Sequence, residues 1–286
     1  MLLLDDGTAT NASPGGRAPT VVYSASDLTI AATCEFALLR GLDAKLGRIP
    51  PLDLPQDAML DRLAELGDRH ERQVLAALRR RYGPYDPATG RGVVEITRPG
   101  RADARDPAVL AAKRDETLAA LRAGADVVFQ AGFFDGRFGG WADFVVRADD
   151  DVLRPAASAP PDDAPPDDAP PGAASLAPTG PPAAWSVHDT KLARRAKVTA
   201  LLQLAAYADQ LLAHGIPLAG DVHLVLGDRT VTAHRLADLL PAYRERRARL
   251  EEIIDAHVAD DAPVAFGDER FHACLRCDVC APEVEA

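Results

Sequence analysis

The stretch WSVHDTKLARRAKVTALLQLAAY, residues 185–207, decides the fold of this chain. Its first part, 185–190, has the apolar pattern of a β-strand, and 192–213 has the apolar spacing of an α-helix. Residues two apart on a strand project from the same face, so we expect the side chains of Asp189 and Lys191 to lie together. A strand that leads directly into a helix favours the α/β class.

Two further strand candidates precede this stretch. Segments 126–134 and 140–147 are rich in Val and Phe, and the Asp-Gly-Arg between them is a hairpin signal. The second strand carries Asp143, which a neighbouring strand can place beside Asp189 and Lys191. We also expect strands at 93–97 and 222–226, helices at 57–82, 115–123 and 236–258, and a helix that begins at an N-cap Ser26 and runs through Leu39. Together these elements predict a small mixed sheet with helices on both faces.

The composition describes a globular chain with one large low-complexity segment. The 286 residues are 47% hydrophobic and 26% charged, and no run of 18 apolar residues occurs. Residues 149–184 hold ten of the 23 prolines, so this segment is expected to be a disordered surface insertion between two adjacent strands. We therefore predict a flexible tail over 1–20, with at most a short strand at Leu2 to Leu4, and a single domain over 21–286. The start of the chain has no basic flank or long apolar core, so a cytoplasmic location without a membrane is expected.

The net charge of −11 argues against a nucleic-acid partner at first sight. However, 149–184 carries seven Asp and one Arg, a net of −6, which leaves −5 for the rest of the chain. A basic group, Arg194, Arg195 and Lys197, follows Lys191 and could contact DNA phosphates. The alternative, a solvated first turn of a helix, is equally consistent with the pattern.

The acidic and basic side chains suit metal-assisted phosphodiester hydrolysis. Two or three hard oxygen ligands can hold Mg²⁺ or Mn²⁺, and a nearby lysine can orient a water molecule and neutralise the transition state. Asp143 and Asp189 would be ligands, with the Thr190 carbonyl and His70 as further ones, and Lys191 would be the catalytic lysine. Each residue also has an ordinary explanation: a strand-end Asp bonding a turn, a solvated Lys, or an exposed helix pair at 70–71.

The order of these residues resembles the RecB-like branch of the PD-(D/E)XK nucleases. The matching positions are His70, Asp143, Asp189-Thr190-Lys191, Gln203 and Tyr207, within about 24–280. The resemblance implies a restriction-endonuclease-like fold and hydrolysis of DNA, with exonuclease action on single-stranded or frayed ends in DNA repair or recombination. It also places Gln203 and Tyr207, four residues apart on one helix face, beside the DNA and the active site; the alternative is an ordinary packed helix face. A second interpretation is a DNA-binding iron–sulfur module of a larger helicase–nuclease assembly, with weak activity alone.

The cysteines point to a second metal site. Cys274, Cys277 and Cys280 form a Cys-x₂-Cys-x₂-Cys run, which resembles the three-ligand portion of a ferredoxin cluster site and leaves Cys34 as the one remaining thiolate. Zinc is the alternative, and free thiols are a weaker one. One early and three late cysteines resemble the iron–sulfur nucleases of the AddB type and the CRISPR adaptation nuclease, which implies a structural 4Fe–4S cluster that joins the two ends of the chain. The early cysteine of such nucleases is often followed by Pro, whereas here Glu35 follows it. A third interpretation is an iron–sulfur protein in which Asp-x-Lys is coincidental.

Overall fold

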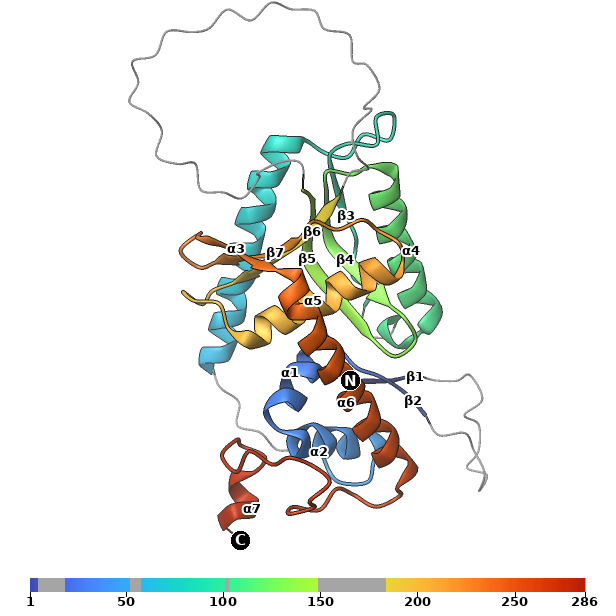
Figure 1. Ribbon diagram of the computed structural model, residues 1–286, viewed down its shortest axis with the longest axis vertical. Helices are drawn as coiled ribbons and strands as arrows, with labels where there is room; N and C mark the ends of the chain where they lie inside the picture. Colours follow the sequence, from blue (N-terminus) through green and yellow to red (C-terminus); the bar gives the residue numbers. More distant parts are fainter. Residues whose placement is uncertain (5–18, 52–57, 101–102, 149–183, 286) are drawn as a thin grey trace, which may run out of the picture.

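A computed structural model describes residues 1–4, 19–51, 58–100, 103–148 and 184–285 (Figure 1). Most of the predicted flexible tail, 5–18, and of the predicted insertion, 149–183, lies outside these described residues. Among them, no helix is long and apolar enough to cross a membrane.

A six-stranded mixed sheet forms the centre of the molecule. Its strands, in spatial order, are β3 (Val93–Glu95), β4 (Val127–Phe134), β5 (Gly139–Arg147), β6 (Trp185–Lys191), β7 (Asp221–Leu226) and β8 (Val231–Arg235). The β3–β4 and β6–β7 pairs are parallel, and the other neighbours are antiparallel. The predicted α/β class with a mixed sheet is therefore confirmed, and β8 is an edge strand that the sequence analysis did not identify.

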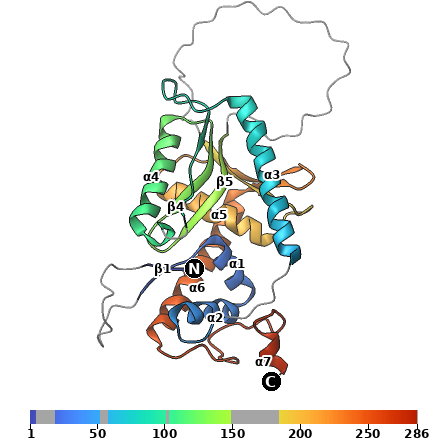
Figure 2. The ribbon, with the colours of Figure 1, turned by 180° about the vertical axis from the view of Figure 1, so that it is seen from behind.

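Helices cover both faces of this sheet, as expected (Figures 1 and 2). They are α3 (Ala58–Tyr82), α4 (Pro107–Ala123) and α5 (Val198–Ala213), with the short 3-10 helix η1 (Asp103–Arg105) before α4; helix α6 (Leu236–Ala259) follows β8 and packs on α5. On one face, α3 packs through Val74, Leu75 and Leu78 against strand residues that include Phe144 and Val225. On the opposite face, α4 and α5 pack against the alternate strand residues: Val128, Val145, Val187 and Leu224. Only the second half of α3 is buried in this way, because Leu63 and Leu66 are exposed.

The first predicted helix is two helices in the structure. Helix α1 (Ala25–Thr33) begins at an N-cap Ser24, two residues before the cap that we expected. It ends at Cys34, whose extended backbone (φ −160°, ψ 102°) breaks the helix before α2 (Glu35–Leu46) begins. The Cys34 side chain caps α2, because its Sγ accepts a hydrogen bond from the N–H of Ala37. The apolar spacing continues through this break, which is why the sequence predicted one helix.

The N-terminal and C-terminal segments lie on the same side of the sheet (Figure 1). Strand β1 (Leu2–Leu4) pairs antiparallel with β2 (Thr20–Val22), so the expected short strand at Leu2 to Leu4 is present. The lower end of α6 runs beside α2, and the C-terminal tail with the short α7 (Ala281–Glu285) returns to the same region (Figure 1). Two expected helices also shift their start: α4 begins earlier, at Pro107 after the N-cap Asp106, and α5 begins later, at Val198.

Candidate functional site

A cavity of 370 Å³ brings together five of the side chains singled out from the sequence. Asp143 comes from β5, Asp189 and Lys191 from β6, and Gln203 and Tyr207 from α5. The remaining wall includes the start of α1, Trp141 and Arg98. The predicted convergence of Asp143, Asp189 and Lys191 is thus present in the structure.

The two carboxylates are held by different partners. Phe144 pairs with His188 across β5 and β6, and the next step along this ladder sets Asp143 opposite Asp189. Asp143 Oδ2 accepts hydrogen bonds from Thr190 N at 2.8 Å and Thr190 Oγ1 at 2.7 Å. Asp189 Oδ2 lies 2.5 Å from Lys191 Nζ. Burial and the nearby Asp143 carboxylate raise the pKa of Asp189 to about 7, although Lys191 opposes this shift.

Tyr207 is fixed against the strands by its ring. It stacks on Phe133 with centroids 5.3 Å apart and meets Phe138 edge-on. Burial, followed by the Asp189 and Asp143 carboxylates, raises the pKa of Tyr207, so its hydroxyl stays protonated. The ring crosses β5 at Gly140, where a Cβ would lie 2.8 Å from Tyr207 Cε1. A glycine is required there by this close approach.

The adjacent residues His70 and Glu71 of α3 point to different places. His70 is buried, with Nε2 3.4 Å from the Val225 carbonyl, and it lines a separate cavity with Gln73 and Arg229. Glu71 instead interacts with Asp143: burial and then this carboxylate raise the pKa of Glu71 to about 7. Neither the predicted ligand His70 nor Glu71 is among the lining residues of the Asp143 cavity, but the Glu71 carboxylate bonds Gln130 of β4, the strand beside Asp143. The only feature of the sequence that pointed to Glu71 was its position next to His70.

Two more residues near the carboxylates were not singled out from the sequence. Arg98, on the connection after β3, lies over the Trp141 ring at 5.8 Å and lines the cavity. Gln130, on β4, hydrogen-bonds to Glu71 through Nε2. Nothing in the local sequence of either residue marks it as part of a site.

The predicted DNA-binding group lies in the connection between β6 and α5. Arg194, Arg195 and Lys197 are exposed and precede the first helical residue, Val198, so they do not form the first turn of the helix. Arg195 and Lys197 line a second cavity of 180 Å³. That cavity shares Lys191 and Gln203 with the first, so a basic surface adjoins the carboxylates.

The four cysteines lie together, as the sequence predicted. Their Sγ atoms are all within 4.8 Å of one another, and Cys34 Sγ is 3.5 Å from Cys280 Sγ. A hydrogen bond from the Arg276 N–H lowers the pKa of Cys274 to about 6, whereas burial raises the pKa of Cys34 and of Cys280, so Cys274 is the thiol that most readily becomes the thiolate that metals bind. Four thiolates around one zinc ion would be about 3.8 Å apart, and a four-iron cluster needs a wider spacing. The group can hold a metal centre: its sulfur spacing is closer to that of a zinc site, while its Cys-x₂-Cys-x₂-Cys run is the pattern of a cluster site.

Glu35, the departure from the expected Pro, ties the cysteine site together. Its carboxylate accepts two hydrogen bonds from Arg249 of α6 at 2.9 Å, and one from the His272 N–H at 2.9 Å. The Arg249 guanidinium and the His272 N–H hold the pKa of Glu35 below its usual range, against the effect of burial. The residue after Cys34 therefore joins α2, α6 and the C-terminal tail.

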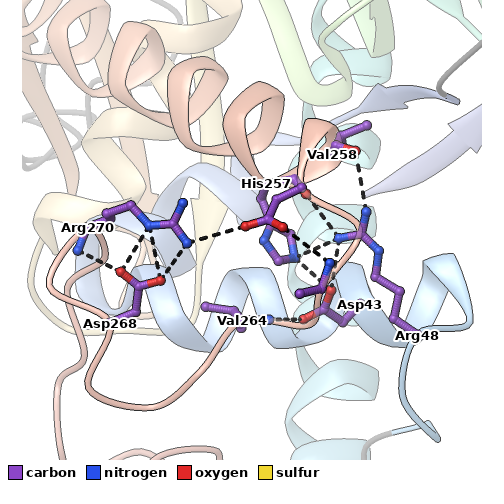
Figure 3. Close-up of polar contacts among 9 residues, drawn as sticks. Asp43, Arg48, His257, Val258, Val264, Asp268 and Arg270 are labelled. Atoms are coloured by element: carbon purple, nitrogen blue, oxygen red, sulfur yellow. Dashed lines mark hydrogen bonds and ion pairs between the residues drawn. The ribbon is translucent and has the colours of Figure 1, made fainter.

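A buried network extends this attachment along α2 (Figure 3). Asp43 is fully buried and accepts from the Val264 N–H at 2.9 Å, while His257 Nε2 lies 2.6 Å from its other oxygen. Arg48 donates to the carbonyls of His257 and Val258 at the end of α6. These contacts fix the start of the C-terminal tail on α2. The three late cysteines follow in the same tail.

The carboxylate site fits a hard divalent cation by its donors. It offers the carboxylates of Asp143 and Asp189, with the Thr190 carbonyl next to Asp189 on β6, all oxygen donors of the kind that Mg²⁺ and Mn²⁺ prefer. Within the described residues, the cysteines are the one group in which three or more His, Cys, Asp or Glu ligand atoms all lie within 4.8 Å of one another.

No family model, curated protein or solved structure matches the chain. The functional argument therefore rests on the side chains and their geometry.

Proposed function

We propose that this protein is a metal-dependent nuclease that hydrolyses DNA phosphodiester bonds. The observation that carries the proposal is the meeting of Asp143, Asp189 and Lys191 at one cavity that adjoins the basic group Arg195 and Lys197. A site built only for stability has little reason to bury Asp189 beside a second carboxylate, because each raises the energy of the other. A divalent cation removes that cost.

Asp143, Asp189 and the Thr190 carbonyl would hold Mg²⁺ or Mn²⁺, which would polarise the phosphate and make a bound water more acidic. Lys191 then orients the water and offsets the negative charge that develops on phosphorus. The water oxygen would bond to phosphorus as one of its protons passes to solvent, and the bond from phosphorus to the leaving sugar oxygen would break as that oxygen takes a proton from solvent. Gln203 and the protonated Tyr207 hydroxyl contact the DNA from α5.

The fold is consistent with a restriction-endonuclease-like core of the RecB type, with an acid on one strand and Asp-x-Lys on the next. Single-stranded or frayed DNA ends, attacked as by an exonuclease, are the substrate that this resemblance supports. The exposed Arg194, Arg195 and Lys197 would contact backbone phosphates, so binding should weaken as salt increases.

A digestion assay tests the proposal. The full chain is incubated with Mn²⁺ and end-labelled single- and double-stranded DNA, beside Lys191→Ala and the control Lys113→Ala. Lys113 is on α4, pairs with Glu116 and is not among the residues that line either cavity. We expect the wild type and Lys113→Ala to digest DNA, and Lys191→Ala to lose at least about a hundredfold in rate. Equal digestion by Lys191→Ala would exclude this site assignment. Tight DNA binding with no digestion by any protein would instead favour a binding module of a helicase–nuclease assembly.

We propose a 4Fe–4S cluster as the occupant of the cysteine site, with zinc as the alternative. The Cys-x₂-Cys-x₂-Cys run supports the cluster, while the close sulfur spacing is also compatible with one zinc ion. Anaerobic purification distinguishes them: the cluster gives a brown protein with broad absorption near about 400 nm. A colourless protein with one equivalent of zinc would support the alternative.

A further inference from the structure

The backbone of β4 is distorted beside the carboxylates. Gln130 has φ +55° in the middle of the strand, a conformation uncommon for residues other than glycine. The side-chain alternation reverses there. Val127 and Phe129 pack with α3, but Ala131 and Phe133, which should follow them, belong to the core on the opposite face. Strain of this kind persists where the surrounding structure holds it, often at a functional site.

The distortion directs the Gln130 amide to Glu71. In the register of β4 and β5, Gln130 lies between the paired positions Phe129–Phe144 and Ala131–Ala142, which sets it opposite Asp143. Its Nε2 donates to Glu71 Oε1. The side chain is 8% exposed, and its Oε1 has no hydrogen-bond partner among the described residues. The buried, unpaired amide oxygen thus belongs to a side chain that bonds one carboxylate, Glu71, and stands opposite another, Asp143, in the register of the sheet, which is unfavourable unless a cation approaches it.

His70 cannot take this role in the observed orientation. Its ring extends toward the Val225 carbonyl of β7 and the separate cavity there. Adjacent residues on a helix point about 100° apart, so α3 can direct only one of the pair at Asp143. Glu71 is the one that faces this part of the sheet, because its Oε1 accepts a hydrogen bond from Gln130, which lies opposite Asp143.

We propose that Glu71 and the Gln130 amide oxygen complete the divalent-cation site from α3 and β4, opposite Asp143 and Asp189, and that His70 anchors α3 to β7. This inference rests on the proposed metal-dependent function and specifies the ligands of the same site. All four donors are hard oxygens, which suits Mg²⁺ or Mn²⁺ better than a set that includes imidazole. The cation would draw together carboxylates that now repel each other.

The test is the dissociation constant of Mn²⁺ for the full chain with its cysteine site filled. It is measured by calorimetry and from the electron paramagnetic resonance signal of the Mn²⁺ that stays free. The variants are Glu71→Gln, His70→Gln and Gln130→Gly, where glycine tolerates the positive φ. Asp189→Asn identifies the site, since binding that survives this change is elsewhere. We expect the dissociation constant to rise at least about tenfold in Glu71→Gln and about threefold in Gln130→Gly, with less than a twofold change in His70→Gln.

The outcomes separate this inference from the proposed function. If Glu71→Gln binds Mn²⁺ as the wild type does, or if His70→Gln loses as much as Glu71→Gln, the ligand assignment is wrong even though the wild type digests DNA. If the wild type neither binds Mn²⁺ nor digests DNA, the nuclease proposal fails with it. Thermal unfolding of each variant shows whether a loss of binding is a loss of fold, and Gln130→Gly then tests the same site independently.

Discussion

At the scale of single residues, the carboxylate cavity stores unfavourable electrostatic energy. Asp189 and Glu71 are both partly or fully removed from water beside Asp143, and both have a pKa raised to about 7. In a protein without its cation this lowers stability, and the cation recovers the difference by binding the folded state. Catalytic sites are commonly less stable than the surrounding core for this reason.

Replacing Glu71 by Gln should therefore stabilise the protein in buffer without divalent cations. The folded pKa of Glu71, about 7, is above its ordinary value of 4.5, so the penalty is absent below pH 4.5, grows between 4.5 and 7, and is complete above 7. After allowance for its partial exposure, we expect a gain of about 1 kcal/mol in the free energy of unfolding at pH 8. Urea unfolding at pH 8 and pH 4.5 measures it. A gain of equal size at both pH values would point to a cause other than ionisation.

Arg98 should contribute to substrate binding. It lines the same cavity as Lys191, and its guanidinium lies over the Trp141 ring, where it can donate to a phosphate oxygen. Arg98→Ala should weaken DNA binding about tenfold, which is about 1.4 kcal/mol. Fluorescence anisotropy with labelled single-stranded DNA measures this, with Arg105→Ala, on the exposed η1 helix, as a control. An increase in KM with unchanged kcat is expected, and a loss in kcat alone would contradict a binding role.

At the scale of secondary structure, the β4–β5 hairpin positions α5 and α6 over the sheet. Asp135 accepts hydrogen bonds from the N–H groups of Arg137 and Phe138, from Gln210 of α5 and from Arg247 of α6. These four donors keep the pKa of Asp135 low despite its burial. The carboxylate thus fixes the helix that carries Gln203 and Tyr207.

Asp135→Asn should destabilise the protein at neutral pH by about 1–2 kcal/mol, since hydrogen bonds to a charged group are replaced by weaker ones. The folded pKa lies below the ordinary value of 3.8, so the contribution of Asp135 is complete above that value and is lost as the pH falls through the folded pKa. The test is the free energy of unfolding of the wild type and of the variant, measured at pH 7 and again in the most acidic buffer in which both stay folded. The difference between them should shrink in acid, and a difference that widens would contradict this role.

The elements differ in how well the sequence predicts them. Strands β4 to β7 were predicted to within about two residues because their Val and Phe runs are bounded by turns. The break at Cys34 was missed because the apolar spacing continues across it, and β8 was missed because Val231–Arg235 carries little apolar character. The convergence of Asp143, Asp189 and Lys191 follows from strand order and the two-residue period. The choice between His70 and Glu71 depends on the rotation of α3 about its axis, and the Gln130 distortion depends on its neighbours, so neither was predictable.

At the scale of the whole molecule, α1 connects the two candidate metal sites. Its first residues line the carboxylate cavity, Thr29 lines the adjoining basic cavity, and its last turn ends at Cys34. Helix α1 also packs on α5, which carries Gln203 and Tyr207. The cysteine site is therefore linked to the carboxylate cavity through a single nine-residue helix, although no cysteine lines that cavity.

Loss of the cysteine site should consequently reduce nuclease activity as well as stability. Cys34→Ser removes the one ligand that belongs to the N-terminal part of the chain, and metal binding at such sites is coupled to folding. We expect the C-terminal tail to become at least about tenfold more sensitive to limited proteolysis, and DNA cleavage to decrease, while hydrogen exchange in β4 to β6 stays slow. Cys277→Ser should give the same result, because it empties the same site from the other end of the chain. If the Cys34→Ser protein cleaves DNA at the wild-type rate although its tail is readily digested, α1 keeps its position without the metal. The cysteine site would then stabilise only the tail.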